Sequence, residues 1–244
     1  MFIDAKDKQS EEINELLRKE AEAGNEDADK IVHCLGHRFL AAGLSGRRVQ
    51  IEGIPGNALG AYLNGAELTV CGNAQDAVGD TMNAGSIVIH GRVGDAAGYA
   101  MRGGKIFIRG DAGYRAGIHM KAYEDKVPVL VIGGCAGSFL GEYQAGGVIC
   151  VLGMDKKDRP LIGEYPCTGM HGGKLILRSD GQGIVFPDGV TACPADSEDL
   201  EEIGRIVSGF CDLFGLSADD VMDSPFTVVR PDTDNPYRQL YVAN

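Results

Sequence analysis

Short apolar runs, each closed by a small residue, recur along the middle of the chain. The closing residues stand at positions 53, 72, 91, 110, 134, 153 and 179, so the successive steps are 19, 19, 19, 24, 19 and 26. Insertions around 123–129 and 154–166 account for the two longer steps. Within each run apolar side chains alternate with others, as in a strand that has one buried face. The period therefore predicts seven strands, one in each repeat.

Two positions of every repeat are aliphatic. The first position holds Val49, Leu68, Ile87, Ile106, Leu130, Ile149 and Leu175, and the second holds Ile51, Val70, Ile89, Ile108, Ile132, Val151 and Leu177. Side chains two residues apart on a strand point to the same face, so both positions contribute to one continuous core. The position between them is polar at Gln50 and Thr69 and apolar at Val88, Phe107, Val131, Cys150 and Ile176. This apolar outer face requires a cover, either the chain's own helices or a partner.

Glycines recur in the linking segments as well. Gly60, Gly79, Gly98, Gly117 and Gly141 form one column, and Gly85, Gly104, Gly147 and Gly173 form another. A repeat with one strand and several glycine turns cannot bury its own apolar face, whereas stacked repeats bury it together through parallel pairing. We therefore predict an all-β core, a parallel β-helix of about seven coils over residues 31–180. A third column, from Leu63 through Met82, Met101, Met120 and Gln144 to Met170, is interpreted as core packing.

The handedness of this β-helix is left open by spacing. Gly79, Gly85 and Gly91 are six residues apart, which imitates the hexapeptide repeat of left-handed acyltransferases. Against that interpretation, the usual step of 19 is not a multiple of six, and each repeat contains only one clear aliphatic strand.

The two ends of the chain have a different pattern. Residues 1–30 are expected to form a charged helix, with Ser10 as its cap, Ile13, Leu16 and Leu17 on one face and an end near Ala23. Residues 181–244 are expected to form a helix that begins near Ser197, with acidic residues in its first turn and an apolar stripe, followed by an extended tail.

Composition and charge narrow the class of protein. Glycine accounts for 36 of 244 residues, tryptophan is absent and the formal net charge is −12. Nucleic acids and anionic membranes need concentrated Lys and Arg, so this balance disfavours both as partners. The chain has no apolar run of the length that spans a bilayer, about 18 residues or more, and its N-terminal region lacks the apolar core of a signal peptide. We expect a cytoplasmic protein.

Cysteine and histidine residues indicate no catalytic or metal centre. The seven cysteines, at 34, 71, 135, 150, 167, 193 and 211, are odd in number and lack a C-x-x-C pair, so we expect reduced thiols. A helix would place His33 and His37 on one face, next to Cys34, but no third or fourth metal ligand is evident. His90, His119 and His171 lie in three different columns, none of which contains a nucleophile. We predict no catalytic, cofactor-binding or metal-binding residues on this chain.

Two polar sets invite a functional interpretation. Asn57, Asp76, Asp95, Tyr114 and Ser138 occupy one column in successive repeats. A ladder of side-chain hydrogen bonds is the expected interpretation of this column, and catalytic carboxylates are the bolder one. Arg102, Arg109, Arg115 and Lys121 are basic positions of the middle repeats. Solvated surface is their default interpretation, and a patch that docks a partner is the second.

The stretch VIGGCAGSFLGEY, residues 131–143, resembles a dinucleotide-binding turn because four glycines follow an apolar run and Asp155 lies farther on. Such a turn must lead into a crossover helix. The segment CAGSFLGEYQAGG, which precedes the next run, contains four glycines and is both too short and too glycine-rich for that helix. Gly137 and Gly141 also align with glycines of earlier repeats, so we interpret these glycines as structural.

The repeats resemble the G-x-G-x-G domain of glutamate synthase, the C-terminal domain of the large subunit, which some microbes encode as a separate protein. The resemblance is carried by GNALGAYLNG, GNAQDAVGDTMNAGSIVIHG, GDAAGYAMRGGKIFIRGDAGYRAGIHMK, GGCAGSFLGEYQAGGVICVLG and TGMHGG, and the tail NPYRQLYVAN resembles the end of the separately encoded form. It is strong over residues 45–180.

This resemblance implies a right-handed parallel β-helix and a role as a non-catalytic scaffold. In glutamate synthase an amidotransferase domain releases ammonia from glutamine, and an FMN and iron–sulfur domain combines the ammonia with 2-oxoglutarate and reduces the product to glutamate. The resemblance implies that both catalytic functions, FMN and the iron–sulfur cluster included, belong to partner subunits, and a homo-oligomer is a further option. The same repeat occurs in one of the subunits of formylmethanofuran dehydrogenase and in N-methylglutamate synthase. A left-handed acyltransferase and a stand-alone binding module are the more distant alternatives.

Overall fold

The computed structural model describes residues 1–24 and 28–232. The tail motif NPYRQLYVAN lies outside the described residues. The elements in chain order are β1 (Phe2–Asp4), α1 (Ser10–Glu22), β2 (Asp29–Leu35), β3 (Arg48–Ile54), β4 (Asn64–Val70), β5 (Ala84–Ile89), β6 (Lys105–Ile108), β7 (Val129–Ile132), β8 (Ala145–Val151), β9 (Gly172–Leu177), β10 (Val190–Pro194), α2 (Ser197–Phe214), α3 (Ala218–Met222) and β11 (Thr227–Pro231). The predicted all-β core is confirmed, since these strands form one mostly parallel sheet.

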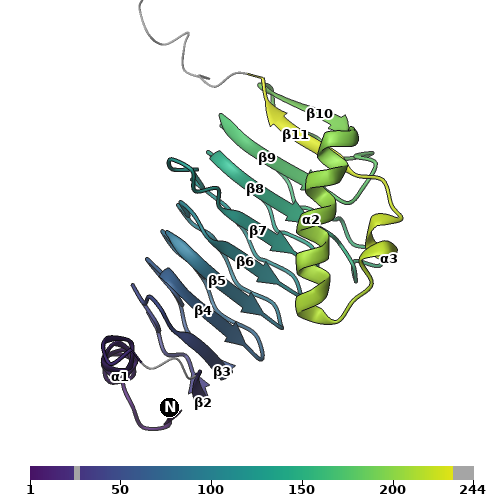
Figure 1. The fold of residues 1–244 in the computed structure, drawn as a ribbon. Helices are drawn as coiled ribbons and strands as arrows, with labels where there is room; N and C mark the ends of the chain where they lie inside the picture. Colours follow the sequence, from purple (N-terminus) through teal and green to yellow (C-terminus); the bar gives the residue numbers. More distant parts are fainter. Residues whose placement is uncertain (25–27, 233–244) are drawn as a thin grey trace, which may run out of the picture.

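Each strand from β1 to β8 pairs in parallel with the next one along the chain, and Figure 1 shows the strands stacked one above another. The seven predicted strands correspond to β3 through β9. The predicted columns are also the observed register, because Leu68 pairs with Ile87 and Ile87 with Ile106. Side chains of both aliphatic positions lie in the interior cluster and are buried. The usual step of 19 residues, lengthened only by the two insertions, thus places like residues in contact from strand to strand.

The ends of the sheet contain strands that the period does not predict. β1 and β2 extend the parallel stack at the N-terminal end, and the pairing of β2 with β3 is interrupted by a register shift between Ile31 and Cys34. At the other end β11 runs antiparallel between β9 and β10, so part of the expected extended tail is a strand of the sheet. The proposed boundaries at residues 30 and 180 remain predictions about domains.

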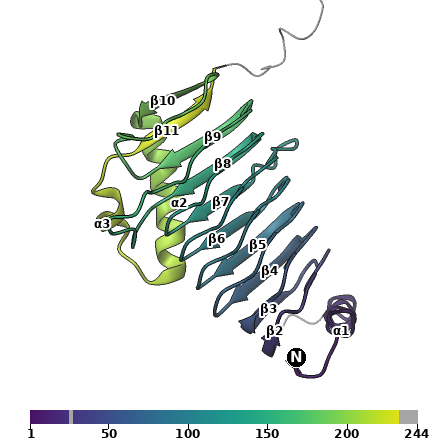
Figure 2. The same ribbon diagram turned by 180° about the vertical axis from the view of Figure 1, so that it is seen from behind.

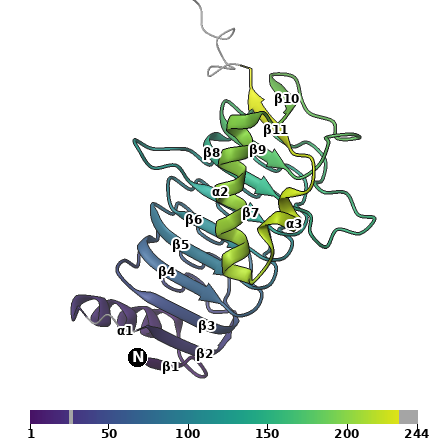
Figure 3. The same cartoon turned by 45° about the vertical axis from the view of Figure 1, so that its right-hand side comes forward.

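Helix α2 covers the apolar part of the outer sheet face. Asp196 caps the start of α2 by accepting a hydrogen bond from the Asp199 N–H, and Gly215 ends it in the left-handed conformation. Its buried face packs on the outer-column residues in a second apolar cluster that contains Val88, Phe107, Val131, Cys150, Ile176, Ile203, Val207 and Phe210. The views from behind and from the side show α2 crossing the later strands, with α3 beside it (Figures 2 and 3). The chain's own helix therefore supplies the expected cover.

Helix α1 lies at the N-terminal end of the core, where Ile13 and Leu17 are fully buried in the interior cluster. A buried ion pair lies at this end as well. The Arg47 guanidinium donates from Nε to Asp29 Oδ2 at 2.9 Å and from Nη2 to Oδ1 at 2.8 Å, and both side chains are almost completely inaccessible. Of the helices over residues 1–24 and 28–232, none has the length and apolar character needed to cross a bilayer.

Candidate functional site

Each of seven repeats contains a turn in which three residues, at positions i, i+2 and i+4, adopt the left-handed conformation. Their φ angles lie between +49° and +70°. The seven triplets are Phe39, Ala41, Gly43; Ala58, Gly60, Tyr62; Ala77, Gly79, Thr81; Ala96, Gly98, Ala100; Arg115, Gly117, His119; Phe139, Gly141, Tyr143; and Tyr165, Cys167, Gly169. A Cβ on Gly79 would lie 2.4 Å from Cδ1 of Ile106, so glycine at the middle position makes room for the core. Several side chains at the outer two positions, such as Tyr62 and Tyr165, are exposed.

Backbone hydrogen bonds to the neighbouring repeats hold these turns in place. The Ala58 N–H donates to the Asp76 carbonyl and the Gly60 N–H donates to the Leu40 carbonyl, each at 2.8 Å. A non-glycine residue in this conformation costs roughly 1–2 kcal/mol, which such contacts must offset. The middle glycines were predicted from the sequence, whereas the outer two positions were not, because alanine, arginine and aromatic residues give no signal of a positive φ.

The polar column forms the predicted ladder of hydrogen bonds. Oδ1 of Asp76 accepts from the Asp95 N–H at 2.9 Å, and Oδ1 of Asp95 accepts from the Tyr114 N–H at 2.8 Å. Asn57 and Ser138 make the corresponding bonds to Asp76 and Glu164, at 3.4 and 3.0 Å. Each of these four side chains thus accepts from a backbone donor one repeat farther on. The geometry therefore supports the ladder rather than catalytic carboxylates.

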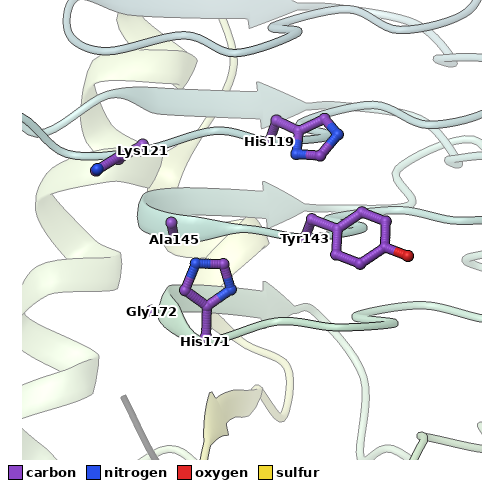
Figure 4. Close-up of a pocket in the computed structure, with 6 residues that line it drawn as sticks. All are labelled: His119, Lys121, Tyr143, Ala145, His171 and Gly172. Atoms are coloured by element: carbon purple, nitrogen blue, oxygen red, sulfur yellow. The ribbon is translucent and has the colours of Figure 1, made fainter. Parts of the chain in front are cut away.

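A surface depression of about 510 Å³ lies beside the left-handed turns of the later repeats. His119, Lys121, Tyr143, Ala145, His171 and Gly172 line it. Figure 4 shows Ala145 between Lys121 and His119 of one repeat and His171 of another. Nδ1 of His171 lies 3.0 Å from the Gly169 carbonyl, which holds this ring in place. None of the lining residues is acidic, so the depression is suited to an anionic group.

Aromatic rings continue from this depression across the neighbouring repeats. The rings of His119 and Tyr143 are stacked at 5.2 Å, and Tyr99 meets His119 edge-on at 5.9 Å. In the other outer column Phe139 stacks with Tyr165 at 5.3 Å, and the Arg115 guanidinium lies 5.0 Å from the centre of the Phe139 ring. This surface was not predicted from the sequence, because its residues come from different repeats and meet only through stacking.

A second concavity, of about 710 Å³, lies between the 154–166 insertion and residues 179–187. Its lining includes the apolar side chains of Leu161, Ile162, Ile184 and Phe186. Arg159, also in the lining, forms an ion pair with Asp111 at 2.8 Å. The hydrogen bond from Arg159 lowers the pKa of the Asp111 carboxyl below its usual range. From the sequence, residues 154–166 were predicted only to be an insertion between two repeats.

The structure brings two of the three candidate metal ligands together, since Sγ of Cys34 lies 3.6 Å from Nδ1 of His37. His33, Cys34 and His37 lie on or just after strand β2 rather than on a helix, because residues 29–35 pair with β1 and β3. Nδ1 of His33 pairs with Asp4 at 2.9 Å, and Nε2 of His37 lies 3.1 Å from the Lys8 carbonyl. Among the described residues no group of three or more His, Cys, Asp or Glu side chains is placed to hold a metal ion.

The four basic positions of the middle repeats have different surroundings. Arg109 pairs with Asp155 at 3.0 Å, and Arg115 pairs with Glu142 at 3.1 Å. Lys121 lines the depression, and Arg102 is exposed. Asp155, which stands where a ribose-binding acid would be in a dinucleotide site, is therefore the partner of a surface arginine.

The glycines after β7 allow the backbone to pack closely against the preceding repeat. A Cβ on Gly133 would lie 2.4 Å from the Arg109 carbonyl oxygen, and one on Gly134 would lie 2.2 Å from Oδ1 of Asp111. Both positions therefore permit close approach of the preceding repeat. The chain passes from β7 to β8 through turns with no helix between them, as expected for structural glycines.

Comparisons with known proteins agree with this fold. The family model described as GXGXG motif matches residues 14–230. An uncharacterized protein of Methanocaldococcus jannaschii is 45% identical over 258 aligned positions, which cover 100% of this chain and 97% of the relative. In the crystal structure of the formyltransferase/hydrolase complex FhcABCD of Methylorubrum extorquens with methylofuran, one chain matches with a TM-score of 0.62 and 22% identity, over 82% of this chain and 72% of that chain. The low identity of the last match makes it evidence for the fold alone.

Proposed function

Because this chain belongs to the GXGXG motif family, we propose that it is a non-catalytic structural subunit that holds the catalytic subunits of an enzyme complex together. The observation that carries the proposal is that a solved chain of the same fold is part of a multi-subunit complex. The proposal includes a right-handed parallel β-helix of about seven coils and a cytoplasmic location.

Two complexes are candidates for this role. The first is a formyl-transferring system related to formylmethanofuran dehydrogenase, and the fold shared with a chain of the formyltransferase/hydrolase complex favours it. The second is glutamate synthase, favoured by the resemblance of the repeats between residues 45 and 180 to its G-x-G-x-G domain. In the second case a glutamine amidotransferase and an FMN and iron–sulfur synthase would be the partners, and both cofactors would be bound there.

Purification of the tagged chain from its native cells tests the proposal. We expect catalytic subunits to co-purify in stoichiometric amounts and to be identified by mass spectrometry. Flavin and iron–sulfur absorbance together with glutamine-dependent glutamate formation would indicate glutamate synthase, whereas formyltransferase and hydrolase subunits would indicate the other system. A chain that elutes alone, close to its mass of 25.8 kDa, and changes the activity of neither enzyme would overturn the proposal.

A further inference from the structure

The outer left-handed positions carry large side chains only in part of the molecule. In two middle repeats these positions hold Ala77 and Thr81, then Ala96 and Ala100. The next two repeats hold Arg115 and His119, then Phe139 and Tyr143, with the same backbone conformation. Small side chains are therefore compatible with this turn. The fold does not account for the large exposed ones.

These large side chains are held in a defined arrangement. Arg115 lies over Phe139 and also donates from Nε to the Glu142 carboxylate at 3.1 Å. The backbone carbonyl of Glu142 accepts from the His119 N–H at 2.9 Å, so one residue connects the two outer columns. Aromatic and arginine side chains that are ordered before binding lose little conformational entropy, and both types are enriched at protein interfaces. This surface thus has the composition and order of a binding surface.

The depression adds a positive charge, that of Lys121, to this surface. Lys121 lines the depression together with His119 and His171, and the lining contains no carboxylate, although the chain as a whole has a net charge of −12. Among the described residues no ion pair of Lys121 with a carboxylate is found. A partner that approaches an acidic protein at this place would gain most by presenting a carboxylate.

We propose that the aromatic face, defined as Arg115, His119, Phe139, Tyr143 and Tyr165 together with the adjacent depression, docks a catalytic subunit of the complex. An acidic side chain of that subunit enters the depression next to Lys121, and apolar side chains cover the rings. The face extends over three repeats and the depression is open to solvent, a shape that fits a protein segment rather than an enclosed small molecule. This inference rests on the proposed function and specifies the docking surface.

The test measures the association of purified variants with the catalytic subunits identified by co-purification, using biolayer interferometry at two salt concentrations. K121E reverses the charge in the depression, and Y143A removes the central ring while leaving a residue type that Ala100 shows to be compatible with the turn. K121R is the conservative variant. R205E is the matched control, because it reverses an exposed charge on α2, none of whose residues lines the depression. Thermal unfolding establishes that all four variants are folded.

We expect K121E and Y143A each to weaken association by about tenfold or more, the loss typical of a residue central to an interface. K121R and R205E should bind like the unmodified chain, and higher salt should weaken binding of the unmodified chain more than that of K121E. If the complex forms and K121E and Y143A bind normally, the docking surface is wrong and the proposed function stands. If the two variants instead abolish only self-association of the chain, the occupant is a second copy and this proposal is overturned. If the unmodified chain binds no catalytic subunit, both proposals are overturned.

Discussion

Among individual residues, the side chains that maintain the repeat are those that bond to backbone one repeat away. Asp76 and Asp95 occupy equivalent positions, and each accepts from the backbone N–H of the residue that follows it in the column. Some glycines are likewise required by contacts with the backbone one repeat away, since the preceding repeat approaches too closely for a Cβ at Gly133. A single substitution in either set therefore acts on two repeats at once.

The ladder can be tested at Asp95. D95A removes the acceptor for the Tyr114 N–H and should lower the free energy of unfolding by about 0.5–1.5 kcal/mol, the usual net value of one hydrogen bond. D95N keeps an oxygen at Oδ1 and should lose clearly less. Urea unfolding followed by circular dichroism measures both, and equal midpoints for the two variants would contradict the ladder.

The cysteines should divide into two classes by reactivity. Burial raises the pKa of the Cys150 and Cys167 thiols to about 12, so both stay protonated at pH 8, whereas Cys71 and Cys193 are exposed. We expect iodoacetamide at pH 8 to alkylate Cys71 and Cys193 in the native protein, and Cys150 and Cys167 only after denaturation, as measured by peptide mass spectrometry.

The same pKa shifts predict a loss of stability at high pH. Unfolded thiols ionise near pH 9 whereas the two buried ones ionise only near pH 12, so stability from this source is complete below pH 9 and falls as the pH rises from 9 towards 12. In the alkylation experiment, rapid reaction of native Cys150 at pH 8 would show that the sheet and α2 do not exclude solvent from this thiol.

Among the elements, α2 is the main addition to the stacked strands. It packs on the outer-column residues of β5 to β9, which are apolar, and leaves the outer faces of β3 and β4 uncovered, where Gln50 is exposed and Thr69 is half-buried. The change from polar to apolar along this column thus marks where the helix begins to cover the sheet. Phe210 is central to the contact, because its ring leaves no room for a Cβ on Gly133.

Truncation of Phe210 tests this cover. F210A should lower the free energy of unfolding by about 3–5 kcal/mol, the usual cost of removing a buried phenylalanine, whereas L213A on the exposed side of α2 should cost less than about 1 kcal/mol. Urea unfolding measures both, and binding of a hydrophobic dye should increase for F210A alone. Similar midpoints for the two variants would mean that α2 adds little to stability.

The molecule as a whole is a stack in which each repeat contacts mainly its neighbours. Val49 pairs with Leu68 and Leu68 with Ile87, always in the same column. Such a stack has interchangeable units, provided that the number of residues between equivalent positions is preserved. The 19-residue step between the early repeats is therefore a structural constraint that can be tested directly.

Deletion of residues 54–72 removes β4 and joins Gly53 to Asn73, which keeps every later residue in its column. We expect this deletion of one whole repeat to give a less stable protein that still unfolds cooperatively, because β4 lies outside the sheet region covered by α2. Deletion of 54–71 shifts the register by one residue, turns the aliphatic columns outward and should abolish cooperative unfolding. Thermal unfolding by circular dichroism distinguishes the two, and identical behaviour would contradict the column model.

Local sequence pattern was sufficient to predict the repeated strands, their parallel register and the need for a cover on the outer face. These features follow from the alternation and spacing of residues such as Leu68 and Val88, because a strand's side-chain period can be read from its own residues. The antiparallel β11 was not predictable, because its place between β9 and β10 depends on contacts with strands that are distant in the sequence.

The candidate site depends instead on tertiary contacts. His119, Tyr143 and His171 are ordinary residues in the sequence, and the stacking of the repeats brings them to one surface with Lys121. The outer left-handed positions that display His119 and Tyr143 were equally unpredictable, because non-glycine residues adopt a positive φ only when hydrogen bonds from adjacent repeats offset the cost. The strands follow from residues close together in the chain, whereas the surface depends on which repeats become neighbours.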